Sequence, residues 1–299
     1  MPPKLLHVLI EKYQVAVPDS VNEFGLPEFL IQELSANQLE EILCDYGYAG
    51  KAVCHYLILN ETIPSIVELE LASKKFPPQP EKVDHPEQDS PLFEYGETDV
   101  RNSLFRVRFS YFHDTQTVYD PDTSLIKQWF SVYNGTMVLR PGKRLIEVRA
   151  SHRPIVRQIA YRAMATMKLP SMSRLNLYTE KFVQSFLQWI NSLNNARLTF
   201  SAEDELSAIS LSAKRAVDLR TTDKFKEYFH DGYLRGAHVT IGKPEEHQIN
   251  FRIFFRDTRV TFTSFANENE ISLVADGLER ISGGGEFRGP RKILEQFFE

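Results

Sequence analysis

The chain has 299 residues, of which 42% are hydrophobic and 25% are charged, a composition typical of a folded globular protein rather than a disordered one. No run of about 18 apolar residues occurs, which argues against a membrane-spanning helix, and the two cysteines, Cys44 and Cys54, provide no disulfide or metal framework. Because the start of the chain also lacks the pattern of a secretory signal, we expect a cytoplasmic protein with no cofactor and no bound metal.

The charge is distributed unevenly along the chain. Residues 1–100 carry six Lys or Arg against 18 Asp or Glu, a net charge of −12, whereas residues 101–168 carry 12 against four, a net charge of +8. Residues 169–299 are almost neutral, at −1. The middle of the chain is therefore expected to attract an anionic ligand, and the beginning of the chain to repel one.

Apolar residues recur at helical spacing through residues 1–76. Ser35 has the side chain and position of a helix N-cap, and further helices are predicted over 52–59 and 66–74. Together these helices would form a compact interaction module over residues 1–76. Five prolines among acidic and polar residues then predict a semi-extended linker over residues 77–98.

After the linker, from residue 99 to 299, the apolar period changes to two. Apolar and polar residues alternate over 105–111, which predicts a half-buried strand with a basic outer face. The segments 136–140 and 145–150 flank Pro141-Gly142-Lys143, a sequence typical of a type II turn, and so predict a hairpin. The other predicted elements are strands over 129–133, 237–241, 249–255 and 259–265, and helices over 152–167, 174–193, 202–219, 222–232 and 270–281.

Strands followed by a helix thus occur twice, over residues 104–167 and 234–281. The sequence therefore predicts an α+β protein, in which a small N-terminal helical bundle precedes an antiparallel-sheet domain of two related β-β-β-α halves. Whether the two β-rich regions share one sheet stays open at this stage.

The segment from Leu34 to Gly47 is followed by the pair Lys51-Ala52, and later by Ile63-Pro64 and Phe76-Pro77. Over residues 25–77 this pattern resembles the small death-like effector-associated domains of bacterial conflict systems. The resemblance implies a helical adaptor that joins a sensor or effector to a protein partner, in the setting of defence against phage. The layout of a helical module before a basic β-rich domain is also similar to the eukaryotic centromere protein N family.

The helix predicted over 152–167 provides the candidate site for an anion. Its apolar residues fall on the face expected to pack against the sheet, and its basic residues fall on the opposite face. Cations at a helix N-terminus, where backbone N–H groups point outward, favour a bound anion, and guanidinium groups bind phosphate bidentately. The alternative is that these side chains pair with the acidic module. The candidate residues for DNA, RNA or another anion are Arg140, Lys143, Arg144, Arg149, His152, Arg153, Arg157, Arg162 and Lys168.

A second nucleic-acid signal lies in the strand predicted over 249–255. There Arg252 and Phe254 alternate with apolar residues. An aromatic ring that lies beside a basic side chain on an open sheet face can stack on nucleobases. A phenylalanine in such a strand more often packs under a helix, and that is the interpretation that the sequence favours for Phe254.

The sequence contains two weak catalytic patterns. His113-Asp114-Thr115 and His238-Val239-Thr240 are similar to the His-x-Thr motifs of two-histidine phosphoesterases, in which paired imidazoles serve as acid and base, although Asp114 departs from the usual apolar middle residue. Asp120 with Glu147-Val148-Arg149 is faintly similar to a metal-dependent nuclease centre, but an arginine stands where that centre requires a lysine.

No reaction is indicated firmly enough to predict an enzyme. The sequence favours a non-catalytic adaptor or sensor whose module over residues 1–76 recruits a protein partner and whose α+β domain binds an anionic ligand, DNA or RNA above all. The alternatives are a phosphodiesterase that uses His113 and His238, and a structural subunit of a larger protein complex.

Overall fold

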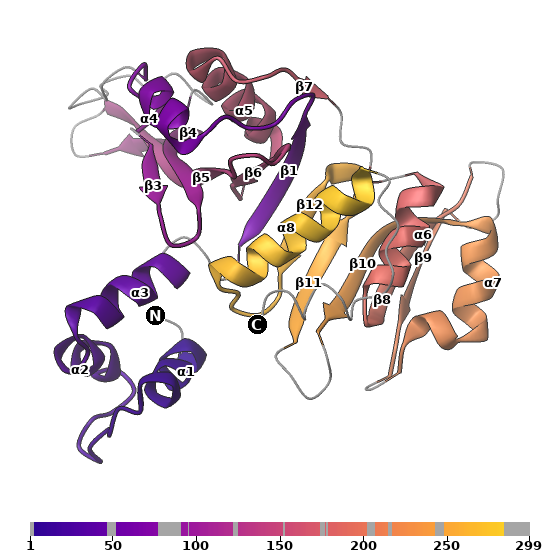
Figure 1. Cartoon of the computed structure of the whole chain (residues 1–299), viewed down its shortest axis with the longest axis horizontal. Coiled ribbons are helices and arrows are strands. Elements are labelled where there is room, and N and C mark those ends of the chain that lie inside the picture. The colour runs from indigo at the N-terminus through magenta and orange to yellow at the C-terminus, as the bar shows by residue number, and fades with distance from the viewer. Residues whose placement is uncertain are drawn as a thin grey trace.

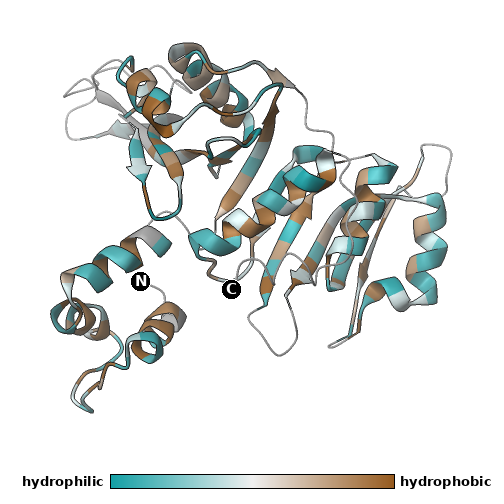
Figure 2. Cartoon of the chain, in the orientation of Figure 1, coloured by the Kyte–Doolittle hydropathy of each residue, from teal (hydrophilic) through white to brown (hydrophobic). Residues whose placement is uncertain are grey.

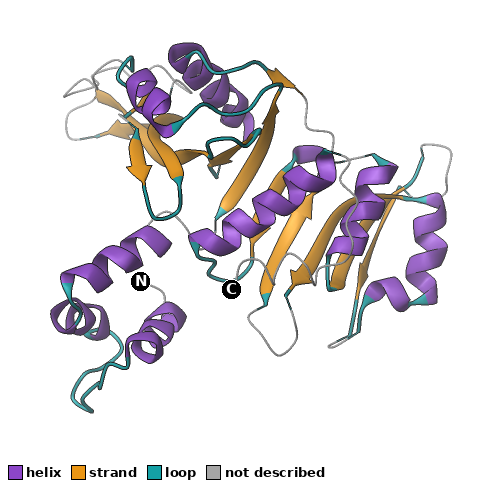
Figure 3. Ribbon diagram, in the orientation of Figure 1, coloured by secondary structure: helices purple, strands orange, loops and turns teal. Residues whose placement is uncertain are grey.

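The computed structural model describes residues 3–46, 52–76, 91–94, 96–121, 125–151, 153–173, 177, 179–201, 207–214, 217–242 and 248–283 (Figure 1). It confirms the α+β class, since helices are combined with one large antiparallel sheet (Figure 3). No helix within these ranges is long and apolar enough to cross a membrane.

Three helices form a bundle of their own at the N-terminal end of the chain. They are α1 (Pro3–Tyr13), α2 (Leu26–Glu33) and α3 (Ala36–Tyr46), and their buried leucines and Ile42 make a separate apolar cluster. The predicted cap is confirmed: the Gln38 N–H donates to Ser35 Oγ at 3.4 Å, and the Ser35 N–H donates to Gln38 Oε1 at 2.8 Å. The bundle contacts the sheet domain through Arg101, which pairs with Glu41 at 3.0 Å.

The helix predicted over 52–59 is wrong, because this segment forms the central strand of the sheet. Strand β1 (Val53–Leu59) lies between β6 (Leu145–Arg149) and β12 (Arg259–Phe262) and is antiparallel to both. Helices cover β1 on both faces, so Tyr56 on one face and His55 on the other are both buried. A strand buried on both faces has no polar-apolar alternation, and a short apolar run of this kind cannot be told from a buried helix.

The helix predicted over 66–74 is confirmed as α4 (Ile66–Ser73), which begins with a capping box formed by Ser65 and Glu68. Its buried face, however, packs into the core beneath the sheet rather than into the N-terminal bundle. Residues 52–76 therefore belong to the sheet domain, and the self-contained helical bundle comprises described residues 3–46 alone.

The linker predicted over residues 77–98 is described only at its end, because residues 77–90 lie outside the described ranges. Strands β2 (Leu92–Phe93) and β3 (Glu97–Asp99) both pair with β4. This last part of the expected linker is therefore an ordered edge of the sheet.

Among the described residues the sheet has twelve strands, ten of them in the order β2-β4-β5-β6-β1-β12-β11-β10-β8-β9, with β3 on β4 and β7 on β1. The two β-rich regions thus share one sheet. The bounds not yet given are β4 (Leu104–Asp120), β5 (Leu125–Leu139), β7 (Met172–Ser173), β8 (Ser192–Thr199), β9 (Ala208–Ser212), β10 (Tyr233–Ile241) and β11 (Ile249–Phe254).

Both expected β-β-β-α segments are present. They are β4-β5-β6 with α5 (Arg153–Met167) and β10-β11-β12 with α8 (Glu268–Ser282), and β1 lies between them. Leu57 and Leu59 of β1 belong to the apolar cluster of α5, whereas Cys54 and Tyr56 belong to that of α8. Because neighbouring strand residues point to opposite faces, α5 covers one face of the first half and α8 the other face of the second half.

The predicted hairpin is confirmed, with Gly142 at a positive φ of 77° in the turn between β5 and β6, as a type II turn requires. Helix α7 (Asp223–Asp231) begins at Thr222 and ends at Gly232, as expected. The helix over 174–193 is shorter than predicted, since α6 (Glu180–Trp189) is followed by strand β8. The helix over 202–219 is wrong in its described part, where β9 pairs with β8 as an edge strand.

A buried network of arginines and carboxylates joins the two halves of the protein. Arg149 of β6 donates two hydrogen bonds to Glu268 at the start of α8, one of them 2.7 Å long, and it also pairs with Glu147. Arg140 pairs with the other side of Glu147 at 3.0 Å. On β4, Arg106 lies 2.6 Å from Asp99 and 3.3 Å from Glu268. The carboxylates therefore neutralise the arginines within the fold (the network residues are all buried).

We expect the substitution Glu268→Gln to lower the free energy of unfolding by about 3–5 kcal/mol, because it removes a carboxylate shared by Arg149 and Arg106 and leaves the buried network with one uncompensated positive charge. The matched substitution Lys143→Gln removes a more exposed pair, with Asp276 at 2.8 Å, and should cost only about 0–1 kcal/mol. Urea unfolding of both variants measures the difference. An equal decrease in the free energy of unfolding in the two variants would show that the buried network does not stabilise the fold more than an exposed ion pair does.

Candidate functional site

The structure separates the predicted anion-binding residues into two groups, and the first lies where no anion can reach it. Arg140 and Arg149 are buried in the network beneath α8, and their guanidinium groups pair with carboxylates. Burial alone would raise the pKa of Glu147, but Arg149 and Arg140 outweigh it and hold that pKa below its ordinary value. These two arginines are therefore structural, which corrects the prediction that they extend a basic surface.

The hairpin residues are also engaged with α8. Lys143 pairs with Asp276, the backbone N–H of Arg144 donates to Glu279 at 2.6 Å, and Arg144 Nε donates to the carbonyl of Leu59 at 3.0 Å. The hairpin thus anchors the middle of α8 to the sheet and does not join a common basic patch with α5.

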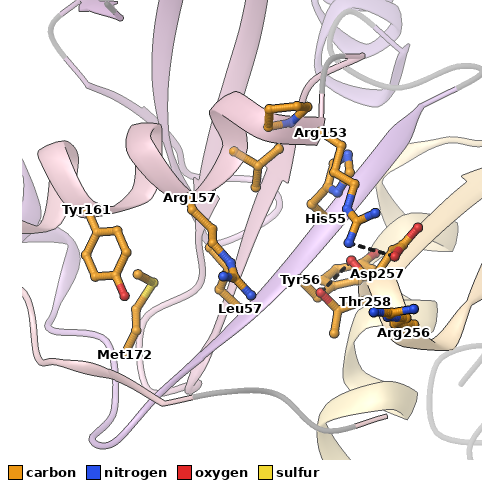
Figure 4. Close-up of a pocket in the computed structure, with 12 residues that line it drawn as sticks. His55, Tyr56, Leu57, Arg153, Arg157, Tyr161, Met172, Arg256, Asp257 and Thr258 are labelled. Carbon is orange, nitrogen blue, oxygen red and sulfur yellow. Dashed lines mark hydrogen bonds and ion pairs between the residues drawn. The ribbon is translucent and has the colours of Figure 1, made fainter. Parts of the chain in front are cut away.

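The second group lies on α5. Arg153 and Arg157 line a cavity of about 680 Å³ between the N-terminal turns of α5, strand β1 and the turn at 255–258 (Figure 4). Arg153 Nη2 lies 2.8 Å from Asp257 Oδ1 across this cavity. Arg162 and Lys168 are exposed near the C-terminal end of α5, and His152 lies outside the described residues. The N-terminal part of α5 is therefore the part that contributes to a concave surface.

A second, larger cavity of about 1050 Å³ adjoins the first and lies on the open face of the second half of the sheet. Arg153, Arg256 and Asp257 line both cavities, so the two share a wall, and together they are called the trough. The described helices α6 and α8 pack on the opposite face of these strands, where the apolar residues cluster. Alternating hydrophobic and hydrophilic bands along the strands of this half reflect the two faces (Figure 2).

The open face is strongly basic. Its larger cavity is lined by one carboxylate, Asp257, and by six arginines, which are Arg153, Arg197, Arg235, Arg252, Arg256 and Arg259. Apart from Arg153, which pairs with Asp257, none of these arginines has an ion pair in the described part of the chain. Like charges that share one surface repel each other, so this arrangement favours an anionic ligand.

Two β-bulges increase the number of polar side chains on this face. The register shift between Leu234 and Gly236 places Arg235 beside Gly236, and the shift between His238 and Val239 places Asn194 beside Asn195. Both members of each pair line the larger cavity. Bulges commonly redirect a side chain next to a functional site, and here each adds one polar residue to the open face.

Phe254 lies on the open face and not beneath a helix, so the interpretation favoured by the sequence is wrong. Its ring is half-buried, and the guanidinium carbon of Arg259 lies 4.0 Å from the ring centroid. Arg252 is exposed beside it and lines the same cavity. The aromatic ring of Phe254 and the basic side chain of Arg252 are therefore both accessible from the open face.

The structure does not favour the paired-histidine chemistry. His238 lies on β10 and His113 on β4, with five strands between them, which corresponds to about 29 Å across a sheet. An acid and a base that act on one phosphodiester must both lie within hydrogen-bond reach of it. Glu147, from the nuclease-like pattern, is buried in the network, and no group of three metal-binding side chains occurs among the residues that the structure describes.

Most residues of the open face could not be recognised as a site from the sequence. Arg197 alternates with buried Ala196 and Leu198, as in a half-buried strand, but this segment follows a helix directly, has no aromatic residue and has Thr199 as its one β-branched residue. The net charge of the segment does not indicate the basic open face either, because residues 169–299 are almost neutral as a whole.

His55 is an unexpected polar residue at the floor of the smaller cavity. It is 3% exposed, and its Nε2 atom has no hydrogen-bond partner among the described residues. Burial, together with the positive charge of neighbouring Arg259, lowers the pKa of His55 from 6.5 to about 4, so its imidazole is neutral at pH 7. This neutral imidazole, with its unpaired ring nitrogen, therefore lies buried at the floor of the cavity, below two arginines.

No protein-family profile matches this sequence, and no curated protein is similar enough to it to serve as a relative. The candidate site therefore depends on the geometry of the trough alone.

We expect His55 to make the protein less stable as the pH falls from about 6.5 to about 4. The unfolded chain takes up a proton on this imidazole near pH 6.5, whereas the folded protein does so only near pH 4. Between these values the unfolded state binds more protons, so the free energy of unfolding decreases with falling pH, by up to about 3 kcal/mol.

A His55→Gln variant lacks this contribution. Urea unfolding of both proteins at about pH 7 and about pH 4 should show the wild type losing up to about 3 kcal/mol more than the variant. If the difference in free energy of unfolding between the two proteins is the same at both pH values, His55 is not a buried, neutral imidazole.

Proposed function

We propose that this protein is a non-catalytic nucleic-acid-binding adaptor, and that the open arginine face of the sheet contacts the nucleic acid. The observation that supports this is the imbalance of charge, six arginines against Asp257 in one cavity of about 1050 Å³. Elsewhere in the same protein, buried arginines are matched by carboxylates such as Glu147 and Glu268. An external polyanion is the partner that would neutralise the open face.

A nucleic acid suits the face better than an acidic protein surface for two reasons. Arginines stand on four neighbouring strands whose backbones are about 4.8 Å apart, and their long side chains can reach successive phosphates. The face also carries Phe254, Asn195 and two serines, side chains that can contact base faces and edges. A carboxylate-rich peptide has no planar base that could stack on the ring of Phe254.

The acidic N-terminal bundle does not supply the missing charge in the described structure. Its carboxylates Glu41 and Asp45 pair with Lys12 of the bundle itself and with Arg101. Tyr46 contacts Phe265, in the segment that precedes α8. Since α8 packs on the opposite side of the second half of the sheet, these contacts leave the arginine face open.

We expect fluorescently labelled DNA or RNA to bind the protein, with an affinity that falls steeply between about 50 and 200 mM salt. The triple variant Arg197→Gln, Arg235→Gln and Arg252→Gln should weaken binding by roughly tenfold or more. It should also lower the salt slope by about two to three, which is about one for each phosphate that the variant no longer neutralises. Fluorescence anisotropy at several salt concentrations measures both quantities.

The matched control is Lys74→Gln, Lys75→Gln and Lys224→Gln, which removes the same charge from exposed positions outside the trough. This control should bind like the wild type. Equal weakening in the two triple variants would mean that net charge alone determines binding, and that the open face is not the site.

We also propose that the helical bundle over residues 3–46 recruits a protein partner. Its exposed surface carries four large apolar side chains, Val8, Phe24, Ile31 and Leu43, and Phe24 is 94% exposed. Exposed apolar side chains mark an interaction surface where they form one contiguous patch, and the proposal is that these four do so. The death-like adaptor resemblance and the setting of anti-phage defence stay hypotheses, since the bundle ends at Tyr46 and part of the resembling segment forms β1.

We expect the triple variant Phe24→Ser, Ile31→Ser and Leu43→Ser to lose a protein that co-purifies with the tagged wild-type chain. The control Val67→Ser and Leu71→Ser removes exposed apolar side chains from α4 instead and should retain that protein. Quantitative mass spectrometry of the captured material compares them. Identical capture by both variants would exclude the bundle as the recruiting surface.

A further inference from the structure

Helix α5 forms one wall of the smaller cavity of the trough. Arg153, Arg157 and Tyr161 are spaced four residues apart on this helix, so they form one stripe along it, and all three line the cavity (Figure 4). Strand β1 forms the floor, and the turn over residues 256–258 forms the opposite wall. The cavity is therefore enclosed on three sides by described parts of the chain.

The two ends of this cavity differ in chemistry. Arg153 and Arg256 lie at one end, and Tyr161, which is 61% exposed, lies beside Met172 at the other, with Arg157 between the two ends (Figure 4). The rise of a helix places the Cα atoms of Arg153 and Tyr161 about 12 Å apart. One nucleotide spans a similar length from its phosphate to the far edge of its base. The cavity thus offers a basic end for a phosphate and an aromatic end for a base.

The basic end has an excess of positive charge. Its one carboxylate, Asp257, pairs with Arg153 at 2.8 Å, whereas Arg157 and Arg256 have no ion pair in the described part of the chain. The first turn of α5 adds the partial positive charge of a helix N-terminus. A terminal phosphate carries about 1.5 to 2 negative charges at pH 7, and a phosphate within a strand carries one. The terminal group therefore gains more from this concentration of cations.

The smaller cavity lies where the open face of the sheet ends. Helix α5 packs over the first half of this side of the sheet, and its apolar contacts reach as far as β1. Arg153, Arg256 and Asp257 line both cavities, so a strand on the open face reaches the smaller cavity past these three residues. The packed helix then blocks the path of the strand along the sheet, which favours a terminal nucleotide at this position.

We propose that the smaller cavity binds a nucleotide by its terminal phosphate, which Arg153, Arg157 and Arg256 hold, while the base stacks on Tyr161. The inference rests on the proposed function where the nucleotide is the end of a bound strand, and a free mononucleotide offers the same chemistry. A guanidinium has five N–H groups, so Arg153 keeps donors for the phosphate while it pairs with Asp257. The aromatic ring accepts any base, because every base has a π-face.

The first test compares adenosine 5′-monophosphate (AMP) with adenosine, which lacks the phosphate, by isothermal titration calorimetry of the intact chain. The wild type should bind AMP more tightly than adenosine by roughly tenfold or more. Arg157 lines the smaller cavity and not the larger one, so Arg157→Gln should remove most of this preference. The control Arg162→Gln removes the same charge from an exposed position on α5 outside the cavity and should bind like the wild type. Equal weakening in both variants would overturn the assignment of the site.

Two further variants are expected to change AMP binding in opposite directions. Tyr161→Leu should weaken it by roughly fivefold or more, through the loss of a stacked base, and keep the preference for AMP over adenosine. The matched control Tyr119→Leu replaces an exposed aromatic residue on β4 and should have no effect. Asp257→Asn removes the carboxylate from the basic end and should tighten AMP binding by roughly two- to fivefold. Weaker binding by Asp257→Asn would contradict the placement of the phosphate. Circular dichroism checks the fold of each variant.

The source of the nucleotide is identified with single strands of DNA and RNA of about ten nucleotides, within the range that comparable binding faces cover. Each strand carries a 5′-phosphate, a 3′-phosphate or a hydroxyl at both ends. Tighter binding of a phosphorylated strand by the wild type, lost in Arg157→Gln, identifies the strand end as the ligand. Equal binding of all strands, together with Arg157-dependent binding of AMP, identifies a free mononucleotide.

The outcomes separate this inference from the proposed function. If all strands bind equally and AMP binds no more tightly than adenosine, the nucleotide site is excluded while nucleic-acid binding stands. If a well-folded wild-type chain binds AMP but no strand, the proposed function fails and the nucleotide site stands. If it binds none of these ligands, both fail.

Discussion

The contact on which the rest of this structure depends is the buried pair of Arg149 and Glu268. It joins β6, in the middle of the sheet, to the first turn of α8, and it is held between Glu147 on one side and Arg106 on the other. A carboxylate in the first turn of a helix is also favoured by the helix dipole, and the capping box of Asn267 and Glu270 fixes where the helix starts. The pair therefore determines which part of the sheet α8 covers.

The cover by α8 explains why the two halves of one sheet have such different polar faces. On the first half, the arginines that face α8 meet carboxylates and become part of the interior. On the second half, the equivalent face has no helix packed over it within the described structure, because the apolar contacts of α5 end at β1. The arginines there have Asp257 as their one carboxylate neighbour in the cavity. The two β-β-β-α units thus give one neutralised face and one basic face.

This difference also shows how far the sequence could lead. The hairpin around Gly142, helix α7 and helix α8 were predicted, because a turn residue, a cap and a regular apolar period mark them locally. Strand β1 was missed, since burial on both faces removes its alternation. The excess of basic residues over 101–168 was evident from the sequence. Whether these residues are buried or exposed depends on carboxylates far along the chain, since Arg149 and Glu268 are 119 residues apart. No local sequence pattern indicates a contact between residues so far apart.

For the same reason, the open face was visible in the sequence only through Arg252 and Phe254. Arg197, Phe254 and Arg259 lie at the same level of the open face because three strand registers align, and registers between distant strands are set by the packed sheet. Burial, and to a smaller extent a neighbouring arginine, lowers the pKa of both histidines of the trough, His55 and His238. Arginines therefore lie beside buried or half-buried imidazoles at both ends of the face, on β10 and on β1, and each imidazole is easier to keep neutral than in water.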